Sequence, residues 1–176
     1  MSRSIKDDAS ASQPGWMQIA EAEEKAGISE LSPATHSRIL EYLATCEDLE
    51  DDEFGRYDTP WCSAFVNWCV LRAGLAGTNS GWARSWRNWG SEDLEPGAGS
   101  IAVWSRFRDV GAGFERVGGH VAFLVADHGE TVEVLGGNQR DQVCRAVYPK
   151  NGFLTDSVDR SGPTSDRYEF LGFRKA

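Results

Sequence analysis

Cys62 and His120 are the residues of this sequence best suited to nucleophilic chemistry. Cys62 follows the segment DTPW (58–61), which predicts the start of a helix because Asp and Thr cap helices and Pro fits the first turn. Unpaired backbone N–H groups and the helix dipole favour a thiolate there, and the thiolate is the reactive form of cysteine. A cysteine nucleophile needs a base, usually histidine. We expect Cys62 to lie exposed at the helix tip, and His120, which opens a strand after two glycines, to meet it.

Asn138 is the third candidate, and its place depends on the tight turn between its strand and that of His120. With a three-residue turn, Asn138 stands directly opposite His120, with Cβ atoms about 5 Å apart. Its amide can then fix the tautomer of the imidazole, as the third member of a Cys-His-Asn arrangement does. With a two-residue turn, Gly137 takes that place instead. The next residue, Gln139, could also orient the ring or donate to an oxyanion.

The other cysteines and the tryptophans have simpler interpretations. The four cysteines show no CxxC or CxxH spacing, which argues against a zinc site and against a disulfide scaffold. Trp61 and Trp86, with Gln139, are candidates for binding substrate. The alternative for the tryptophans is packing in the core. Small buried side chains are the simplest interpretation of three cysteines, namely Cys46, Cys69 and Cys144.

Apolar residues recur with helical spacing in the first half of the chain and with a period of two after Pro96-Gly97. The third helix should bury one side, formed by Trp61, Phe65, Trp68 and Cys69. Helices followed by strands, without alternation, predict an α+β fold with an antiparallel sheet of about five strands. The expected helices span 16–26, 32–46, 60–74 and 82–89; the expected strands span 100–105, 120–126, 131–135, 142–148 and 169–174; and long loops are expected at 106–119 and 149–167.

Length and charge limit the classes of protein that fit. The 176 residues predict a flexible N-terminal tail over 1–14 and a single domain over 15–176. The net charge of −9 disfavours binding to nucleic acid. Apolar runs fall short of the roughly 20 residues that span a bilayer, so no membrane insertion is expected. The N-terminus has no apolar segment of a classical signal peptide, which predicts synthesis in the cytoplasm.

Three sequence blocks, DTPWCSAFVNWC (58–69), GGHVAF (118–123) and GGNQ (136–139), resemble the motifs of CHAP-type cysteine, histidine-dependent amidohydrolases/peptidases. More closely, they resemble a bacterial and phage subgroup of papain-like, NlpC-like cell-wall hydrolases. The segments ILEYL (39–43) and ARSW (83–86) add to the resemblance, which covers roughly residues 16–149 and the final strand. One departure is the segment PGAGS (96–100), which lacks the acidic residue that such families usually carry there.

The resemblance implies a papain-like core in which the nucleophile opens a helix packed on the sheet that bears the base. It assigns Cys62 as nucleophile, His120 as base and Asn138 as orienting residue. Such families cleave amide bonds in the peptide stems of peptidoglycan, or the amide that joins stem to sugar. The implied mechanism runs through a thioester, with the backbone N–H of Cys62 as an oxyanion donor and with no metal or organic cofactor.

The biological setting that follows is a cell-wall hydrolase exported without a classical signal. Phage lysis is one route to the wall. Delivery into the periplasm of a rival cell as a type VI secretion effector, with a cognate immunity protein that plugs the cleft, is the other. Two alternatives to this function stay open: a thiol deamidase or transacylase that acts on proteins, and a folded interaction domain whose triad is inactive.

Overall fold

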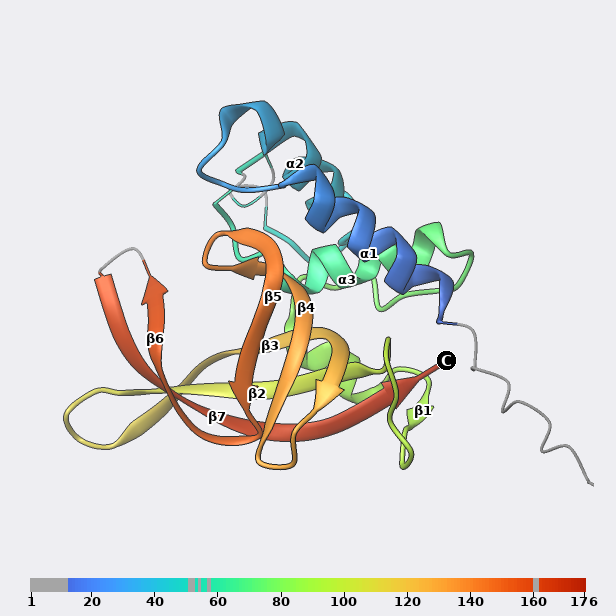
Figure 1. The fold of residues 1–176 in the computed structure, drawn as a ribbon. Helices are drawn as coiled ribbons and strands as arrows, with labels where there is room; N and C mark the ends of the chain where they lie inside the picture. The colour runs from blue at the N-terminus through green and yellow to red at the C-terminus, as the bar shows by residue number, and fades with distance from the viewer. Residues whose placement is uncertain (1–12, 51–52, 54, 57, 160–161) are drawn as a thin grey trace, which may run out of the picture.

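The computed structural model describes residues 13–50, 53, 55–56, 58–159 and 162–176, in which a layer of helices lies against a curled antiparallel sheet (Figure 1). The expected tail over 1–14 falls, except for its last two residues, outside the described residues. The helices are α1 (Gly15–Ala26), α2 (His36–Leu43) and α3 (Cys62–Arg72), with 3-10 turns η1 (Pro33–Thr35) and η2 (Ala83–Asn88). The strands are β1 (Ser91–Glu92), β2 (Ile101–Asp109), β3 (Phe114–Asp127), β4 (Thr131–Gln139), β5 (Gln142–Pro149), β6 (Asn151–Asp159) and β7 (Gly162–Lys175).

The α+β class is confirmed, but the sheet has seven strands in the described residues instead of about five. The extra strands lie largely where the sequence predicts loops. The segment 106–119 is mostly a hairpin, because β2 continues to Asp109 and β3 begins at Phe114. The segment 149–167 forms β6 and the first part of β7. These strand ends carry charged side chains and glycines, so backbone pairing and ion pairs such as Arg108–Asp166 hold them without an apolar alternation in the sequence.

Helix α3 is buried on all sides instead of on the one side that the sequence predicts. Every residue from Cys62 to Val70 is buried. Residues from α1 and α2, including Met17 and Tyr42, join the same hydrophobic core, and the sheet closes the remaining side. The enclosed residues are mostly apolar, the buried polar side chains of Ser63 and Asn67 are hydrogen-bonded, and the first turn has no side-chain cap.

The sheet carries a different core on each of its faces. Val121 and Phe123 of β3 pack with the helices, whereas Ala122 and Leu124 face the inside of the curl. The strand order is β1-β7-β2-β3-β4-β5. Strand β6 lies outside this order: it pairs with β7 and also contacts β5. The inner face therefore forms a second core of aromatic and aliphatic side chains, including Trp104, Tyr148, Tyr168 and Phe173.

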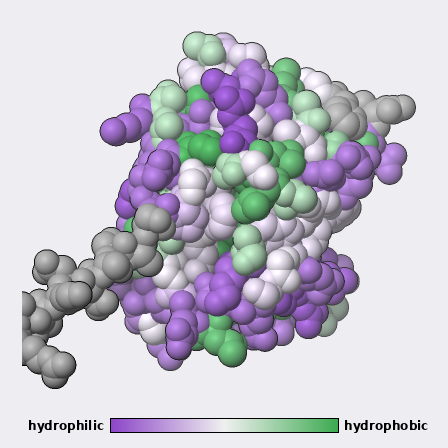
Figure 2. All heavy atoms as spheres, turned by 90° about the vertical axis from the view of Figure 1, so that its right-hand side faces the viewer, coloured by the Kyte–Doolittle hydropathy of each residue, from purple (hydrophilic) through white to green (hydrophobic). Residues whose placement is uncertain are grey.

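The surface is mixed in character. On the face that carries the start of α1 and the C-terminus, hydrophilic residues predominate and apolar residues gather in small groups (Figure 2). No helix in the described part of the chain is long and apolar enough to cross a membrane.

Candidate active site

Cys62 is the first residue of α3, directly after Trp61, which serves as the N-cap without a side-chain hydrogen bond. The helix thus begins two residues later than the sequence predicts, and Pro60 precedes it. The first turn of α3 packs closely on β4 at Gly137. A Cβ at Gly137 would lie 2.6 Å from Phe65 Cβ and 2.6 Å from Trp61 Cζ3. Only glycine lets the start of the helix approach the strand this closely.

His120 lies on β3, opposite Trp104 of β2. Its imidazole is stacked on the ring of Tyr148, with 4.6 Å between centroids and 19° between planes. The preceding Gly119 has no room for a side chain, since a Cβ there would lie 2.5 Å from the carbonyl oxygen of Trp104 and 2.9 Å from Arg84 Cγ. The absence of a side chain at Gly119 therefore lets β2 and η2 lie close to the backbone before His120.

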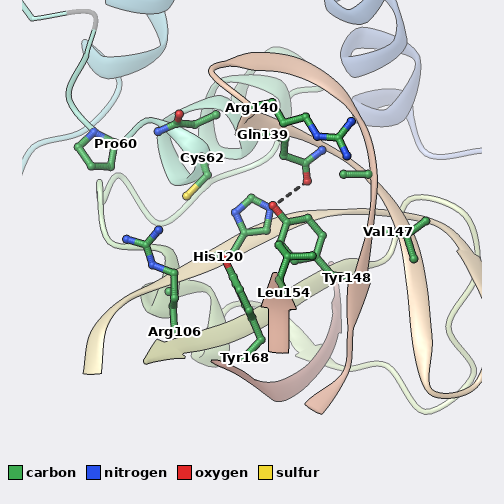
Figure 3. Close-up of a pocket in the computed structure, with 13 residues that line it drawn as sticks. Pro60, Cys62, Arg106, His120, Gln139, Arg140, Val147, Tyr148, Leu154 and Tyr168 are labelled. Carbon is green, nitrogen blue, oxygen red and sulfur yellow. Dashed lines mark hydrogen bonds between the residues drawn. The ribbon is translucent and has the colours of Figure 1, made fainter. Parts of the chain in front are cut away.

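The sulfur of Cys62 points toward the imidazole of His120, on the side of the ring away from Gln139 (Figure 3). Both residues line one cavity of about 110 Å³. The structure thus brings together the two residues that the sequence singles out for nucleophilic chemistry. The thiol is not exposed at the helix tip, however: Cys62 is 8% and His120 5% exposed.

The hydrogen-bond partner of the imidazole is Gln139. Its Oε1 lies 2.9 Å from Nε2 of His120 (Figure 3). The other end of the same amide donates to the carbonyl oxygen of Cys144, which fixes the oxygen as the atom that faces the ring. An acceptor at Nε2 requires a proton on Nε2, so Nδ1 is left unprotonated, with its lone pair free to accept the thiol proton.

Asn138 does not take the place that the sequence predicts for it. The three-residue turn is not observed, because Asp127 pairs with Val132. A β-bulge between Leu124 and Ala126 nevertheless pairs Phe123 with Leu135, the register that would bring Asn138 opposite His120. A β-bulge between Gly136 and Gln139 intervenes, and Asn138 adopts a left-handed backbone with φ of 55°. The extra residue transfers Gln139 to the imidazole side of the strand and turns Asn138 away.

The side chain of Asn138 instead supports the segment before the nucleophile. With its amide oriented to satisfy both ends, Asn138 accepts from the backbone N–H of Trp61 at 3.2 Å and donates to Glu30 Oε1 at 3.3 Å. The same Glu30 oxygen accepts from Trp61 Nε1 at 2.6 Å. Asn138 therefore lines the cavity and holds the chain at the residue before Cys62.

Trp61 and Trp86 have no surface with which to bind a substrate. Both side chains are fully buried, and both belong to the core between the helices and the sheet. The indole N–H of Trp86 donates to Ser63 Oγ, which in turn donates to the carbonyl of Ser80. The prediction that they bind substrate is wrong, and their packing in the core, the alternative, is observed.

The environment of the thiol and the imidazole favours the neutral form of each. Burial raises the pKa of Cys62. Hydrogen bonds from backbone N–H groups, such as that of Val121, and the charge of Arg106 lower this pKa but do not offset the effect of burial. Burial lowers the pKa of His120 to about 4, with the hydrogen bond to Gln139 acting in the opposite direction. Burial therefore opposes charge on both side chains, and the thiolate depends on these N–H groups, on Arg106 and on transfer of its proton to His120.

The low pKa of His120 makes the stability of the fold depend on pH. Between about pH 4 and pH 6.5 the unfolded chain binds a proton on this residue and the folded chain does not, so stability falls as the pH falls through this window. The shift corresponds to about 3 kcal/mol of unfolding free energy. Urea denaturation of the wild type and of His120→Gln across this range should show the extra loss in the wild type alone. Parallel pH profiles for the two proteins would contradict the assigned pKa.

Several residues of the cavity carry no signal in the sequence. Tyr148, Leu154 and Tyr168 come from β5, β6 and β7 and form the wall across from the helix (Figure 3). Tyr148 lies within a predicted strand, but its stacking on His120 depends on how the sheet curls. Arg106 falls in a segment predicted to be a loop, so its place beside Cys62 follows only from the extension of β2.

Residues 54–138 match the family model described as the CHAP domain. The match contains Cys62 and His120 and ends at Asn138, one residue before Gln139. This match supports a hydrolase of the amidase or peptidase type that acts on peptidoglycan. Neither the curated proteins nor the solved structures contain a significant match to the chain.

Proposed function

We propose that this protein, whose residues 54–138 form a CHAP domain, is a cysteine hydrolase that cleaves amide bonds in the peptide stems of peptidoglycan with Cys62, His120 and Gln139. The observation that carries the proposal is the arrangement of three side chains from separate elements. A thiol at the start of α3 points toward an imidazole on β3, and an amide on β4 fixes the tautomer of that imidazole.

The reaction would begin with proton transfer from the thiol of Cys62 to Nδ1 of His120 as the sulfur attacks the carbonyl carbon of the scissile amide. The carbonyl oxygen becomes an oxyanion. Backbone N–H groups in the first turn of α3, that of Cys62 among them, support it because they have no partner within the helix. The proton on His120 then passes to the leaving amine, the C–N bond breaks and a thioester remains.

Hydrolysis of the thioester would use the same groups in reverse. His120 takes a proton from water, the hydroxide attacks the thioester carbonyl, and the sulfur leaves and regains its proton. The products are a carboxylic acid and an amine. During both steps the imidazole is transiently charged, and the oxygen of Gln139 stabilises that charge through its hydrogen bond to Nε2.

Digestion of purified sacculi tests the proposed function. The wild type should release soluble muropeptides, and mass spectrometry of the new amine and carboxyl ends would identify the bond. Incubation with candidate proteins tests the alternative: a mass change of about 1 Da per glutamine would indicate a deamidase. Release of no fragment from sacculi by a folded wild-type protein would contradict the proposed function.

Gln139 and Asn138 give a matched comparison for the role of the orienting amide. Gln139→Ala should lower kcat about 10- to 100-fold, because a hydrogen bond to a charged group contributes about 1.5–3 kcal/mol. Asn138→Gly, which suits the left-handed backbone at that position, should lower kcat much less. Because Gln139 acts through His120, Gln139→Glu should also shift the acidic limb of the pH–rate profile to higher pH. A larger loss in Asn138→Gly than in Gln139→Ala would restore the triad predicted from the sequence.

A further inference from the structure

The charge of the cavity is opposite to that of the whole chain. The chain carries a net charge of −9. The residues that line the cavity nevertheless include two arginines, Arg106 and Arg140, and among the residues that the structure describes no Asp or Glu lines it. A positive, partly enclosed cavity attracts a negatively charged group even where the protein as a whole is acidic.

Arg106 lies on the Cys62 side of the imidazole, with its guanidinium directed toward the sulfur, whereas Arg140 lies beyond Gln139 (Figure 3). The residue opposite Arg106 on β3 is Gly118, which leaves space beside the side chain. The charge of Arg106 lowers the pKa of both Cys62 and His120, as expected for a cation close to both. A group bound by Arg106 would therefore lie beside the reacting carbonyl.

The guanidinium of Arg106 has donors to spare. Its side chain is 31% exposed and also interacts with the hydroxyl of Tyr168, and its Nε is buried without a hydrogen-bond partner. The carboxylate near it, that of Asp166, lies 3.7 Å from Nη1 and is already engaged by Arg108, whose Nε and Nη2 donate to its two oxygens at 2.9 and 3.1 Å. The exposed part of this planar guanidinium is suited to bind a carboxylate.

We propose that Arg106 binds a carboxylate of the substrate beside the bond that Cys62 attacks, so that the preferred substrates are acidic peptides. This inference rests on the proposed function and adds the substrate class to it. Arg140 contributes positive charge at the opposite end of the cavity. Arg106 acts here as a specificity-determining residue.

The test uses a stem peptide and derivatives in which each carboxylate in turn is converted to a carboxamide. The wild type should cleave one derivative about 10- to 100-fold less efficiently in kcat/KM than the parent peptide, the effect of losing a charge-assisted hydrogen bond. Arg106→Gln should cleave these two peptides with nearly equal kcat/KM, and Arg106→Lys should show an intermediate ratio. The matched control is Arg116→Gln, an exposed arginine of β3 outside the cavity, which should keep the wild-type ratio.

The ratio of the two peptides separates recognition from any general loss of activity or folding. The carboxylate site is overturned if Arg106→Gln keeps the wild-type ratio or if no carboxamide derivative differs from the parent. If the wild type cleaves no stem peptide, the proposed function fails, and calorimetric titration of Cys62→Ala with the parent and the derivatives decides the site separately. The site is supported if Cys62→Ala binds the parent peptide and the double variant Cys62→Ala/Arg106→Gln does not. Absence of binding to Cys62→Ala would overturn the site.

Discussion

Cys62→Ala is expected to lower the rate of sacculus digestion by at least about 10³-fold, because the variant has no atom that can form the thioester. The structure predicts little change in folding, since the side chain loses one sulfur atom at the margin of a cavity. Thermal denaturation should give a Tm close to that of the wild type. Dye release from labelled sacculi measures the rate over the range required.

Cys69→Ala is the matched control for this prediction. Cys69 lies two turns further along the same helix and is fully buried among apolar side chains. Its loss should cost stability of about 1 kcal/mol through a small void while leaving the rate of digestion near that of the wild type. Equal loss of activity in both variants would indicate damage to α3, and undiminished digestion by Cys62→Ala would remove Cys62 from the mechanism.

His120→Ala is expected to lower the same rate by about 10³-fold, because the thiol of Cys62, whose pKa burial raises, then has no base to accept its proton. The substitution leaves a space beside the ring of Tyr148, on which the imidazole is stacked in the wild type. Free imidazole added to His120→Ala should occupy this space and restore part of the activity, and the extent of rescue should rise with pH as imidazole loses its proton.

Rescue by imidazole distinguishes a lost base from a disturbed fold. His128→Ala, in the turn between β3 and β4, is the control and should digest sacculi at the wild-type rate with or without imidazole. Full activity of His120→Ala would contradict the role of His120. Loss of activity together with a lowered Tm and no rescue would assign His120 to packing instead.

The pairing of Cys62 with His120 could be predicted from the sequence because a recognisable signal precedes each residue, although only Cys62 begins its element and His120 lies inside β3. The helix start is marked by Pro60, and the strand by two glycines before an apolar alternation. The α+β class follows in the same way from the change of period near residue 97.

The residue whose amide orients His120 could not be assigned from the sequence, because the assignment depends on one β-bulge in β4. Asn138 and Gln139 are adjacent, and an irregularity of a single residue decides which of them faces the imidazole. The two glycines before them are compatible with either outcome. Both residues are candidates from the sequence, and only the left-handed backbone at Asn138 decides between them.

The burial of the site was missed for a related reason. The helix tip is exposed in a sheet of five strands, whereas β6 and the first part of β7 add a wall that carries Leu154 and Tyr168. That wall comes from a polar segment whose pairing leaves no apolar pattern. Trp61 and Trp86 were candidates for a binding wall because aromatic content does not distinguish a core from a surface.

Alkylation by iodoacetamide tests most directly whether His120 activates Cys62, because it needs no substrate and reports on each thiol separately. Cys144 is the more exposed thiol, so accessibility alone would make it react first. Peptide mapping by mass spectrometry near neutral pH should instead show Cys62 modified at least about tenfold faster than Cys144, with sacculus digestion lost at the same rate. In His120→Ala this preference should disappear. Faster modification of Cys144 in the wild type, or digestion that survives complete modification of Cys62, would contradict the account.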